Sequence, residues 1–431
     1  MIRVGIIGLG TVGTGTYRIL KEHHDLIKSR TGIDIKVAKV ADIDLNKAIA
    51  MGLNKDMFTT DAFDIINDKK IDIVVELIGG TTAAYDFIIE SIKNRKGIIT
   101  ANKSLLAQRG REIFRLARLH GSPLGFEASV CGGIPVIRAV KEGLVANKIT
   151  SIMGILNGTS NYIMTKMTEE GKPFKDALRD AQSHGFAEQD PTYDVEGIDA
   201  AHKLCILISL AFGCHINMKD ITTRGITKIE PVDIELAKEF GYRIKLLAIA
   251  RQDEGKLEAR VEPAMIPISH PLSSVGDVFN AVYIVGDMVG PNMFYGKGAG
   301  SEPTGSAVVS DIVDIARIIE SKNTLKGFSG LRFNNRIKIK RSDDSCVPFY
   351  LRFTAQDMPG VLSKVSGILA KYMISISTVI QKGRQENGYV PIVMLTHEAI
   401  EGDIKKAIEE IDRLPFIKGE SIYIRIEEGL S

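Results

Sequence analysis

The stretch MIRVGIIGLGTVG (Met1–Gly13) decides the fold of the first part of the chain. A short, β-branched apolar run typical of a buried strand ends in GLGTVG, and residues 11–30 have the apolar spacing of a helix. Three glycines with the GxGxxG spacing therefore lie at a strand-to-helix turn, the context that dinucleotide binding requires. The first permits a tight turn, the second lets a pyrophosphate approach the backbone, and the third lets helix and strand pack closely. The helix N-terminus adds N–H groups and partial positive charge. The predicted cofactor contacts here are Gly8, Gly10, Thr11, Val12 and Gly13.

Strand and helix signals alternate from this loop to about residue 130. Further strands are predicted at IDIKVAKVAD (33–42), at IDIVVELIGG (71–80) and at the start of KGIITANK (96–103). Alternation at this spacing implies a parallel, doubly wound sheet of the Rossmann type. We predict a dinucleotide-binding domain over residues 1–130, completed by a helix at 306–325 that packs back on it.

The second predicted strand ends in VADID, which contains Asp42 and Asp44. Either carboxylate could accept hydrogen bonds from a ribose 2′-hydroxyl, which favours NAD. The distance from Gly13 to Asp42 is about 30 residues, longer than the usual spacing of about 20. No Arg follows the strand directly to receive a 2′-phosphate, although Lys47 could reach one. NAD is favoured, with Asp42 as the contact, and NADP stays open.

The remaining chain reads as two further domains. Longer helical and strand-like segments predict an α+β domain over residues 131–305, for substrate binding and dimerisation. A polar segment closed by a Pro predicts a linker at 331–347. Residues 348–431 have the order strand, helix, strand, strand, helix, strand, which predicts a small ferredoxin-like module. The fold class is therefore α/β, with these two domains appended to the Rossmann-type sheet.

Composition excludes several classes of function. The 431 residues are 44% hydrophobic and carry a net charge of +2, so no strong field favours nucleic acid or an anionic membrane. No apolar run is long enough to span a membrane. The start of the chain reads as a strand rather than a signal peptide. The four cysteines lack metal-ligand or CxxC spacing and read as free thiols in a reducing compartment. We expect a cytoplasmic protein with no nucleic-acid or membrane partner.

The segment GFAEQDPTYDVEGIDAAHK (185–203) concentrates carboxylates next to an apolar run, LCILISLAF. A solvated loop is the ordinary explanation of such a segment. However, Asp199 and Lys203 are four residues apart on one predicted helix face. The apolar run indicates that this helix is largely buried, and a Lys entering it needs a partner or a role. With Glu188 and Asp194 on the preceding loop, the residues predict a concave acidic site with a cation at its floor. Such a site suits a substrate with a protonated amine and a reactive oxygen.

The run from Ala181 to Lys203 resembles the signature segment of the homoserine dehydrogenases. Other motifs agree with this resemblance and are spread over residues 1 to about 325. They are GLGTVG, VVELIGG (74–80), TANKSLLA (100–107), FEASVCGGIPVI (126–137), GILNGTSNYIM (154–164) and GKGAGSEPTGSAVVSD (296–311). The resemblance implies NAD(P)-dependent interconversion of L-aspartate 4-semialdehyde and L-homoserine, a step in threonine, methionine and isoleucine biosynthesis.

The same resemblance implies roles for individual residues. Lys203 would be the proton donor to the developing alkoxide, and Asp199 would hold it. Glu188 would bind the substrate amine with the help of Asp194. Lys103 follows a Rossmann strand and would lie at the carboxyl edge of the sheet, between cofactor and substrate. A loop of glycines that ends at Gly300 would close over the nicotinamide.

The motif FEASVCGGIP further implies a monovalent cation, Na⁺ or K⁺. The ligands carried over from the family are the Glu127 carboxylate and the backbone carbonyls of Val130, Gly132 and Ile134. Hard oxygen ligands suit such an ion. Cys131 stands where we expect a Gly, so its Cβ has to point away from the ion.

The C-terminal stretch DMPGVLSKVSGILAKYMISIS resembles the ACT regulatory domain. The turn before its helix implies a small amino-acid ligand, with L-threonine as the expected effector. Backbone N–H groups near Gly360 and Val361 would bind the ligand carboxylate, and Asp357 its amine. A purely structural role in dimerisation is the alternative. We expect a homodimer or, through paired ACT domains, a homotetramer.

Two other functions are compatible with parts of the sequence. Another semialdehyde dehydrogenase would need a Cys nucleophile, and none of the four cysteines has a motif that suggests activation. A catalytically silent sensor of NAD or threonine would not need both Lys103 and Lys203, and both are present.

Overall fold

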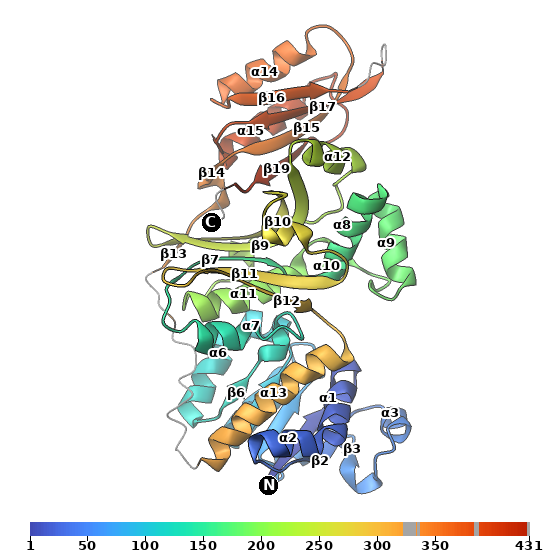
Figure 1. Ribbon diagram of the computed structural model, residues 1–431, viewed down its shortest axis with the longest axis vertical. Coiled ribbons are helices and arrows are strands. Elements are labelled where there is room, and N and C mark those ends of the chain that lie inside the picture. The colour runs from blue at the N-terminus through green and yellow to red at the C-terminus, as the bar shows by residue number, and fades with distance from the viewer. Residues whose placement is uncertain (322–332, 334–336, 383–387, 429–431) are drawn as a thin grey trace. The chain divides into compact units, whose positions relative to one another are not determined.

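The computed structural model describes residues 1–321, 333, 337–382 and 388–428. This part of the chain divides into two compact units, each described here by itself (Figure 1). The first comprises Met1–Gly158, Asp199–Ile221 and Val278–Ile337, and the second comprises Thr159–Ile198, Thr222–Asp277 and Lys338–Ser431. Within the described ranges, no helix is both long and apolar enough to cross a membrane.

The first unit is built on a parallel sheet with the strand order β3-β2-β1-β4-β5-β6. This is the Rossmann-type doubly wound order, and the predicted fold class is confirmed. The order reverses between β1 and β4, and ligands of such sheets bind at the carboxyl ends of the strands near this point. The strands are β1 (Ile2–Ile7), β2 (Ile35–Ala41), β3 (Phe58–Thr59), β4 (Ile73–Glu76), β5 (Gly97–Thr100) and β6 (Leu124–Gly125).

Helices cover this sheet, because the strands are apolar on both faces and must be buried on both. The helix α13 (Ser301–Glu320) packs against α1, where a Cβ added at Gly15 would lie 2.3 Å from the carbonyl oxygen of Ser301. Val308, Ile312 and Ile315 of α13 join the core beneath the sheet. The other helices are α1 (Thr11–Glu22), α2 (His24–Thr31), α3 (Leu45–Ala50), α4 (Phe63–Ile66), α5 (Ala83–Lys93) and α6 (Lys103–His120).

The rest of the first unit contains an antiparallel set of strands in the order β12-β11-β7. The long apolar helix α11 (Ile198–Ala211) supplies Asp199 and Lys203, and both residues are buried. The elements of this part are α7 (Val136–Arg138), β7 (Ile149–Ile155), β11 (Phe279–Gly286) and β12 (Gly290–Lys297).

The second unit contains a long antiparallel hairpin, β9 (Tyr242–Asp253) and β10 (Lys256–Pro267), with a two-residue turn at Glu254 and Gly255. The short strand β8 (Thr222–Thr223) pairs with β10 in parallel. The helices that accompany the hairpin are α8 (Gly158–Glu170), α9 (Phe174–Ser183), α10 (Thr192–Val195) and α12 (Pro231–Glu239).

The C-terminal module of the second unit has the predicted ferredoxin-like order. Its sheet runs β19-β15-β17-β16 with neighbouring strands antiparallel, and its two helices pack on one core with the sheet. The last strand, β19, also pairs in parallel with β10, through Ala264 with Arg425 and Met265 with Ile426. The elements are β15 (Phe349–Gln356), α14 (Val361–Lys371), β16 (Ile376–Gln381), β17 (Tyr389–Thr396), α15 (Glu401–Asp412) and β19 (Ile422–Ile426).

Buried charges accompany the pairing of β10 with β19. The Arg260 guanidinium contacts Glu258 at 2.8 Å and Glu262 at 3.1 Å, and it also pairs with Glu427. Arg425 lies against the same two carboxylates, Glu258 and Glu262, at 2.5 and 3.3 Å. Breaking such a pair leaves an uncompensated buried charge, so the two strands are held in a single register.

Three segments differ in detail from the sequence-based expectation. The helix expected over residues 11–30 is two helices that meet at His23. The helix expected at 306–325 already begins at Ser301, and Pro303 fits there because Pro is tolerated in the first turn of a helix. The expected end of this helix, at 322–325, lies outside the described residues. In the expected linker, 331–347, the described part includes β13 (Lys338–Ile339), which pairs with β10, and β14 (Cys346–Val347).

Candidate active site

The glycine loop joins β1 to α1 and opens onto a cleft of about 510 Å³. Gly8 has a φ of 103°, and a Cβ at Gly13 would lie 1.9 Å from the carbonyl oxygen of Gly8. No described atom lies within 4 Å of a Cβ built at Gly10. Two of the glycines are therefore required by the fold itself, whereas Gly10 leaves open the side from which a phosphate can approach the α1 N-terminus, with Thr11 and Val12 as its first residues. The cleft is also lined by Ile43, Lys47, Phe63 and Ile78.

Asp42 follows β2 directly and turns its carboxylate toward the glycine loop. Its Oδ2 accepts the N–H of Leu9 at 2.6 Å, and its Oδ1 accepts the N–H of Asp44 at 2.9 Å. Lys47 Nζ lies 3.4 Å from Oδ1. Burial opposes ionisation of Asp42, but the two backbone N–H groups and the Lys47 charge outweigh it, so its pKa lies below the ordinary value. A carboxylate and a lysine thus stand together beside the loop.

Asp199 lies between two lysines in the first unit. Lys203 Nζ is 2.7 Å from Asp199 Oδ2, and Lys103 Nζ is 2.9 Å from Asp199 Oδ1. Burial opposes ionisation of Asp199, but the charges of Lys203 and Lys103 outweigh it and hold the pKa of this carboxyl well below its usual range. The side chain of Lys203 is 9% exposed and that of Lys103 is 43% exposed. The cluster therefore combines one buried and one accessible cation on a single carboxylate.

Further groups, which sequence reasoning did not single out, fix this cluster in place. Asn157 Nδ2 donates to Asp199 Oδ2 at 2.9 Å, and Lys203 Nζ donates to the carbonyl oxygen of Leu156 at 2.6 Å. Asn280 Nδ2 donates to the same carbonyl at 2.9 Å. Leu156 and Asn157 lie in the motif GILNGTSNYIM, which was the only signal for them. Asn280 had no such signal, because the residue that it contacts is far away along the chain.

Lys103 is positioned by a hydrogen-bonded loop at the carboxyl edge of the parallel sheet. Asn102 caps α6 by accepting the N–H of Leu105 at 3.0 Å, and its amide donates to the carbonyl oxygen of Gly80 at 2.6 Å. Thr100 donates to the buried carboxylate of Glu76 at 2.6 Å, which ties the ends of β4 and β5 together. Lys103 therefore begins α6 at the same edge of the sheet as the glycine loop.

The loop around Glu127 is also in the first unit. Both oxygens of Glu127 accept backbone N–H groups of α7, from Ile137 and Arg138, at 2.8 Å each. Burial raises the pKa of Glu127 and raises that of Asp311, whose carboxylate accepts the Glu127 N–H at 2.8 Å, to about 7. The predicted partners of Glu127, the carbonyls of Val130, Gly132 and Ile134, belong to the turn that follows it. Among the described residues, no group of three or more His, Cys, Asp or Glu side chains is arranged to hold a metal.

Cys131 adopts a φ of 54°, the left-handed conformation that favours glycine. This accounts for the expectation of a Gly at this position. Its sulfur lies 3.7 Å from Asn280 Nδ2. Burial raises the pKa of the thiol to about 11, and that of Cys205 to about 12. Neither thiol is activated as a nucleophile, which argues against a dehydrogenase that acts through an acylated cysteine.

The remaining predicted site residues are distributed over both units. Gly300, with a φ of 122°, immediately precedes α13 in the first unit. Glu188 and Asp194 belong to the second unit, where Glu188 is exposed on the loop after α9 and Asp194 is half-buried in α10. Their roles toward Lys203 stay predictions.

The predicted effector turn precedes α14 in the second unit. Gly360 has a φ of 92° and gives the turn its left-handed residue, and α14 begins at Val361. Asp357 Oδ1 accepts from Gln381 Nε2 at 3.3 Å. The turn thus leads to a helix N-terminus that no described side chain caps, and its ligand stays a prediction.

Sequence comparison covers both the catalytic and the C-terminal parts. A family model described as "Homoserine dehydrogenase" matches residues 135–313, and one described as "Homoserine dehydrogenase, NAD binding domain" matches residues 8–127. An ACT domain model matches residues 349–416.

Individual proteins are similar over the whole length. A homoserine dehydrogenase of Pseudomonas aeruginosa is 43% identical over 99% of this chain and 99% of its own. The crystal structure of a homoserine dehydrogenase from Thiobacillus denitrificans is 43% identical and superposes with a TM-score of 0.92, over 99% of this chain and 98% of that one. A hyperthermophilic archaeal homoserine dehydrogenase in complex with NADPH is 25% identical, with a TM-score of 0.62 over 77% of this chain and 99% of that one.

The fold and the matched families define an NAD(P)-dependent oxidoreductase that carries an ACT domain. The chain belongs to the homoserine dehydrogenase family.

Proposed function

We propose that this chain interconverts L-aspartate 4-semialdehyde and L-homoserine with Lys203 as the proton donor. The observation that carries this assignment is the Asp199 carboxylate shared by Lys203 and Lys103. Both lysines belong to the unit that contains the glycine loop, and Lys103 begins its helix at the carboxyl edge of the parallel sheet. The product serves threonine, methionine and isoleucine biosynthesis.

The proton and the hydride have separate sources in this mechanism. When bound, the nicotinamide supplies the hydride in the reductive direction and accepts it in the oxidative direction. Lys203 donates a proton to the carbonyl oxygen as negative charge develops there, and takes the hydroxyl proton in reverse. Asp199, ionised at neutral pH, keeps Lys203 oriented, and Lys103 adds a second positive charge next to the oxygen.

Glu188 and Asp194 supply the binding energy for the substrate amine in this proposal. Glu188 lies on the loop after α9 and Asp194 lies in α10, and this segment of the chain leads into α11, which carries Asp199 and Lys203. A protonated amine that binds them would orient the substrate by its end remote from the reacting carbon.

The cofactor contacts are Gly8, Gly10, Thr11, Val12, Gly13, Lys103 and Gly300, with Asp42 selecting between the two dinucleotides. The Asp42 carboxylate would repel a 2′-phosphate and accept from a 2′-hydroxyl, so NAD is favoured. Lys47 acts in the opposite direction and favours NADP, since its ammonium group is 3.4 Å from that carboxylate and could bind a 2′-phosphate. The similar archaeal protein was solved with NADPH, so NADP remains in the proposal as the second cofactor.

A monovalent cation, Na⁺ or K⁺, fits the donor set of the loop after Glu127. All four proposed ligands are oxygens, from the Glu127 carboxylate and the carbonyls of Val130, Gly132 and Ile134. The Cys131 sulfur, a soft donor in the same loop, lies against Asn280. The ion would stiffen the loop that leads into α7.

Regulation and assembly complete the proposal. L-Threonine would bind the ACT turn, with its carboxylate on the N–H groups near Gly360 and Val361 and its amine on Asp357. The working form would be a cytoplasmic homodimer or homotetramer.

The decisive experiment measures L-homoserine oxidation by the absorbance of the reduced nicotinamide, with NAD and with NADP, in buffers containing Na⁺ or K⁺. The full chain should turn over, and Lys203→Met should lose nearly all turnover while still binding the cofactor. Addition of L-threonine tests the effector, and light scattering gives the oligomeric state. Absence of turnover with both cofactors would favour the silent-sensor function instead.

A further inference from the structure

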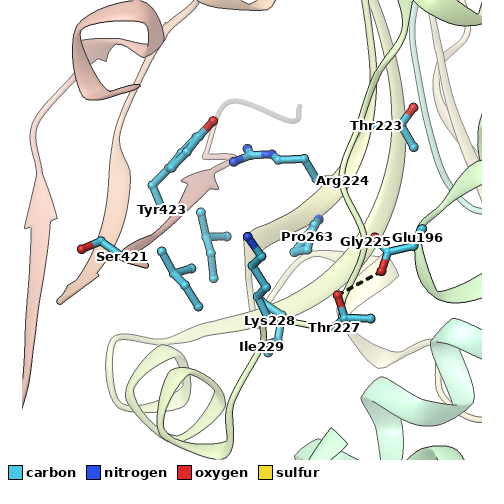
Figure 2. Close-up of a pocket in the computed structure, with 12 residues that line it drawn as sticks. Glu196, Thr223, Arg224, Gly225, Thr227, Lys228, Ile229, Pro263, Ser421 and Tyr423 are labelled. Carbon is cyan, nitrogen blue, oxygen red and sulfur yellow. Dashed lines mark hydrogen bonds between the residues drawn. The ribbon is translucent and has the colours of Figure 1, made fainter. Parts of the chain in front are cut away.

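A pocket of about 320 Å³ in the second unit is not used by the proposed mechanism (Figure 2). One wall is the segment 223–229, which begins at the last residue of β8, and the opposite wall is formed by residues 421–424 at the start of β19. Pro263 of β10 and Glu196, from the end of α10, complete the lining. The pocket is at the lower end of the size range of small-molecule sites. It is separate from the turn at 357–361, because no residue of that turn lines it.

Charges of both signs line the pocket. Figure 2 shows Arg224 and Lys228 on one wall, with Tyr423 facing the guanidinium. The Arg224 guanidinium lies 4.0 Å from the centre of the Tyr423 ring and is held by the buried Glu262. Lys228 is 70% exposed and pairs with Glu420. On the other side, Glu196 accepts the hydroxyl of Thr227 at 3.0 Å. Cations at one end and a carboxylate at the other suit a ligand that carries both charges.

Aliphatic side chains form the rest of the lining, between the charged groups. Ile229, Ile422 and Ile424 all line the pocket, and Ile229 and Ile424 are buried. A ligand body that is apolar and short would displace water from these surfaces at a favourable free energy. The combination of a zwitterionic head group and an aliphatic side chain describes an aliphatic α-amino acid.

The pocket wall is packed tightly against the segment that leads to α11. A Cβ at Gly225 would lie 2.4 Å from the carbonyl oxygen of Val195 and 2.4 Å from Glu196 Oε2, so no side chain fits there. Ile226 donates its N–H to the same Val195 carbonyl at 2.9 Å. α11 begins at Ile198 and carries Asp199 as its second residue. A ligand that moves the wall therefore acts on the chain three to four residues before Asp199.

We propose that this pocket is a second effector site, distinct from the turn at 357–361, which binds an aliphatic α-amino acid and alters turnover through the 195–198 segment. The ligand carboxylate pairs with Lys228 and Arg224, and its ammonium group pairs with Glu196. The effect on turnover rests on the proposed function, whereas the binding does not.

Binding is tested on the full chain with a single fluorescent reporter. The sequence contains no Trp, so Tyr423→Trp introduces one indole at the pocket wall while keeping an aromatic face for Arg224. L-Isoleucine, L-leucine and L-valine are titrated, and calorimetry on the unaltered chain checks that the reporter does not create the site. We expect saturable binding of at least one of the three. A flat response to all of them in both assays would overturn the proposal.

Two pocket variants and a control locate the ligand. Lys228→Ala and Glu196→Gln should each weaken binding by about tenfold or more, because each removes one charge-assisted contact. The 2-hydroxy acid that matches the bound amino acid should lose the Glu196 contact and bind correspondingly weakly. Lys238→Ala, at an exposed position of α12 outside the pocket, should bind like the parent. Binding that is lost in Asp357→Asn but kept in Lys228→Ala would assign the ligand to the other turn and overturn the proposal.

The rate effect is measured separately. A saturating amino acid should change kcat or KM for homoserine several-fold in the parent and leave Lys228→Ala unaffected. Binding without any rate change would overturn the link to Asp199. Absence of homoserine turnover in all conditions would instead count against the proposed function, and the fluorescence result would still decide the pocket.

Discussion

Lys103, the first residue of α6, forms an ion pair with Asp199 in the first turn of α11, with 2.9 Å between Nζ and Oδ1. This contact joins the helix that follows the Rossmann strand β5 to the helix that carries the proposed proton donor. One carboxylate therefore fixes two cations, Lys103 and Lys203, and the two should behave as a unit rather than as independent contributors.

Replacement of Lys103 and Lys203, singly and together, tests whether the two lysines act through the shared Asp199 carboxylate. Lys203→Met should lower kcat by about two to four orders of magnitude, the range for loss of a general acid. Lys103→Met should also lower kcat, and the double variant should lose less than the product of the two single losses, because both side chains act through Asp199. Steady-state kinetics of homoserine oxidation on the three variants gives the comparison.

Lys166→Met is the matched control, since Lys166 also pairs with a carboxylate four residues away, Glu170, but this pair is more exposed than the pair of Lys203 and Asp199. It should keep the parent kcat. If the loss of kcat in the double variant equals the product of the two single losses, Lys103 and Lys203 act independently, contrary to this account.

Substitutions of two glycines in the loop should have different effects, one on the stability of the protein and the other on cofactor binding. Gly13→Ala places a Cβ on the carbonyl oxygen of Gly8 and should lower Tm, because the neighbour is backbone and has little room to shift. Gly10→Ala meets no described atom within 4 Å, so it should leave Tm unchanged and raise KM for the dinucleotide. Thermal unfolding and steady-state kinetics measure the two effects. An unchanged dinucleotide KM in Gly10→Ala would contradict the approach of a phosphate at this residue.

Asp42 and Lys47 should act in opposite directions on cofactor preference. Asp42→Asn keeps an acceptor for the Leu9 N–H but removes the charge that repels a 2′-phosphate, so the ratio of kcat/KM for NADP over NAD should rise by about tenfold. Lys47→Ala should lower the same ratio. The measurement is kcat/KM for each cofactor at saturating homoserine. A ratio that neither change moves would exclude this pair as the selecting groups.

Lys245 on β9 should make stability depend on pH. It is buried and donates to Asn161 Oδ1 at 3.1 Å and to the carbonyl oxygen of Val275 at 2.5 Å. Burial lowers its pKa to about 7, and the Arg243 charge adds to this effect. The unfolded chain would then hold a proton that the folded chain has released, so the Lys245 contribution to stability rises with pH above about 7 and is lost as pH falls toward it.

Lys245→Met removes this titration. The free energy of unfolding of the variant relative to the parent should fall as pH rises from 7 to 9, with a slope of up to about 1.4 kcal/mol per pH unit. Lys238→Met, at an exposed position, should show no such slope. Denaturant unfolding at several pH values gives the difference, and parallel pH curves for Lys245→Met and the parent would refute the proposed titration.

Much of the fold is encoded in local patterns. The glycine loop, the alternation of strands and helices, and the order of elements in the C-terminal module depend on residues that are near each other in sequence. The Asp199 and Lys203 pair was also predictable, because residues four apart on a helix share a face. These expectations concern contacts within one element or one turn.

The contacts that complete the site join residues far apart in the chain. Sequence spacing gives no sign that Asp42 accepts from Leu9, that Asp311 holds the backbone of Glu127, or that Lys103 reaches Asp199. Each follows from the packing of whole elements, and packing depends on the total shape of the core rather than on any one motif. The early start of α13 was missed for a related reason, since Pro303 and Gly305 suggest a loop until the closely packed α1 is known.

Because β10 pairs with β19, part of the sheet in the second unit can form only after the end of the chain has been synthesised. β19 lies between β15 and β10, so neither neighbour has its full set of partners until residues 422–426 have been synthesised. Until then Glu258 lacks its partner Arg425 and Arg260 lacks its partner Glu427, although Arg260 can already pair with Glu258 and Glu262 of the hairpin. The strands of the parallel sheet are synthesised early, but the hairpin and the C-terminal module can pair only after β19 has been made. A stop codon before residue 422 would therefore remove the strand that pairs with both β10 and β15.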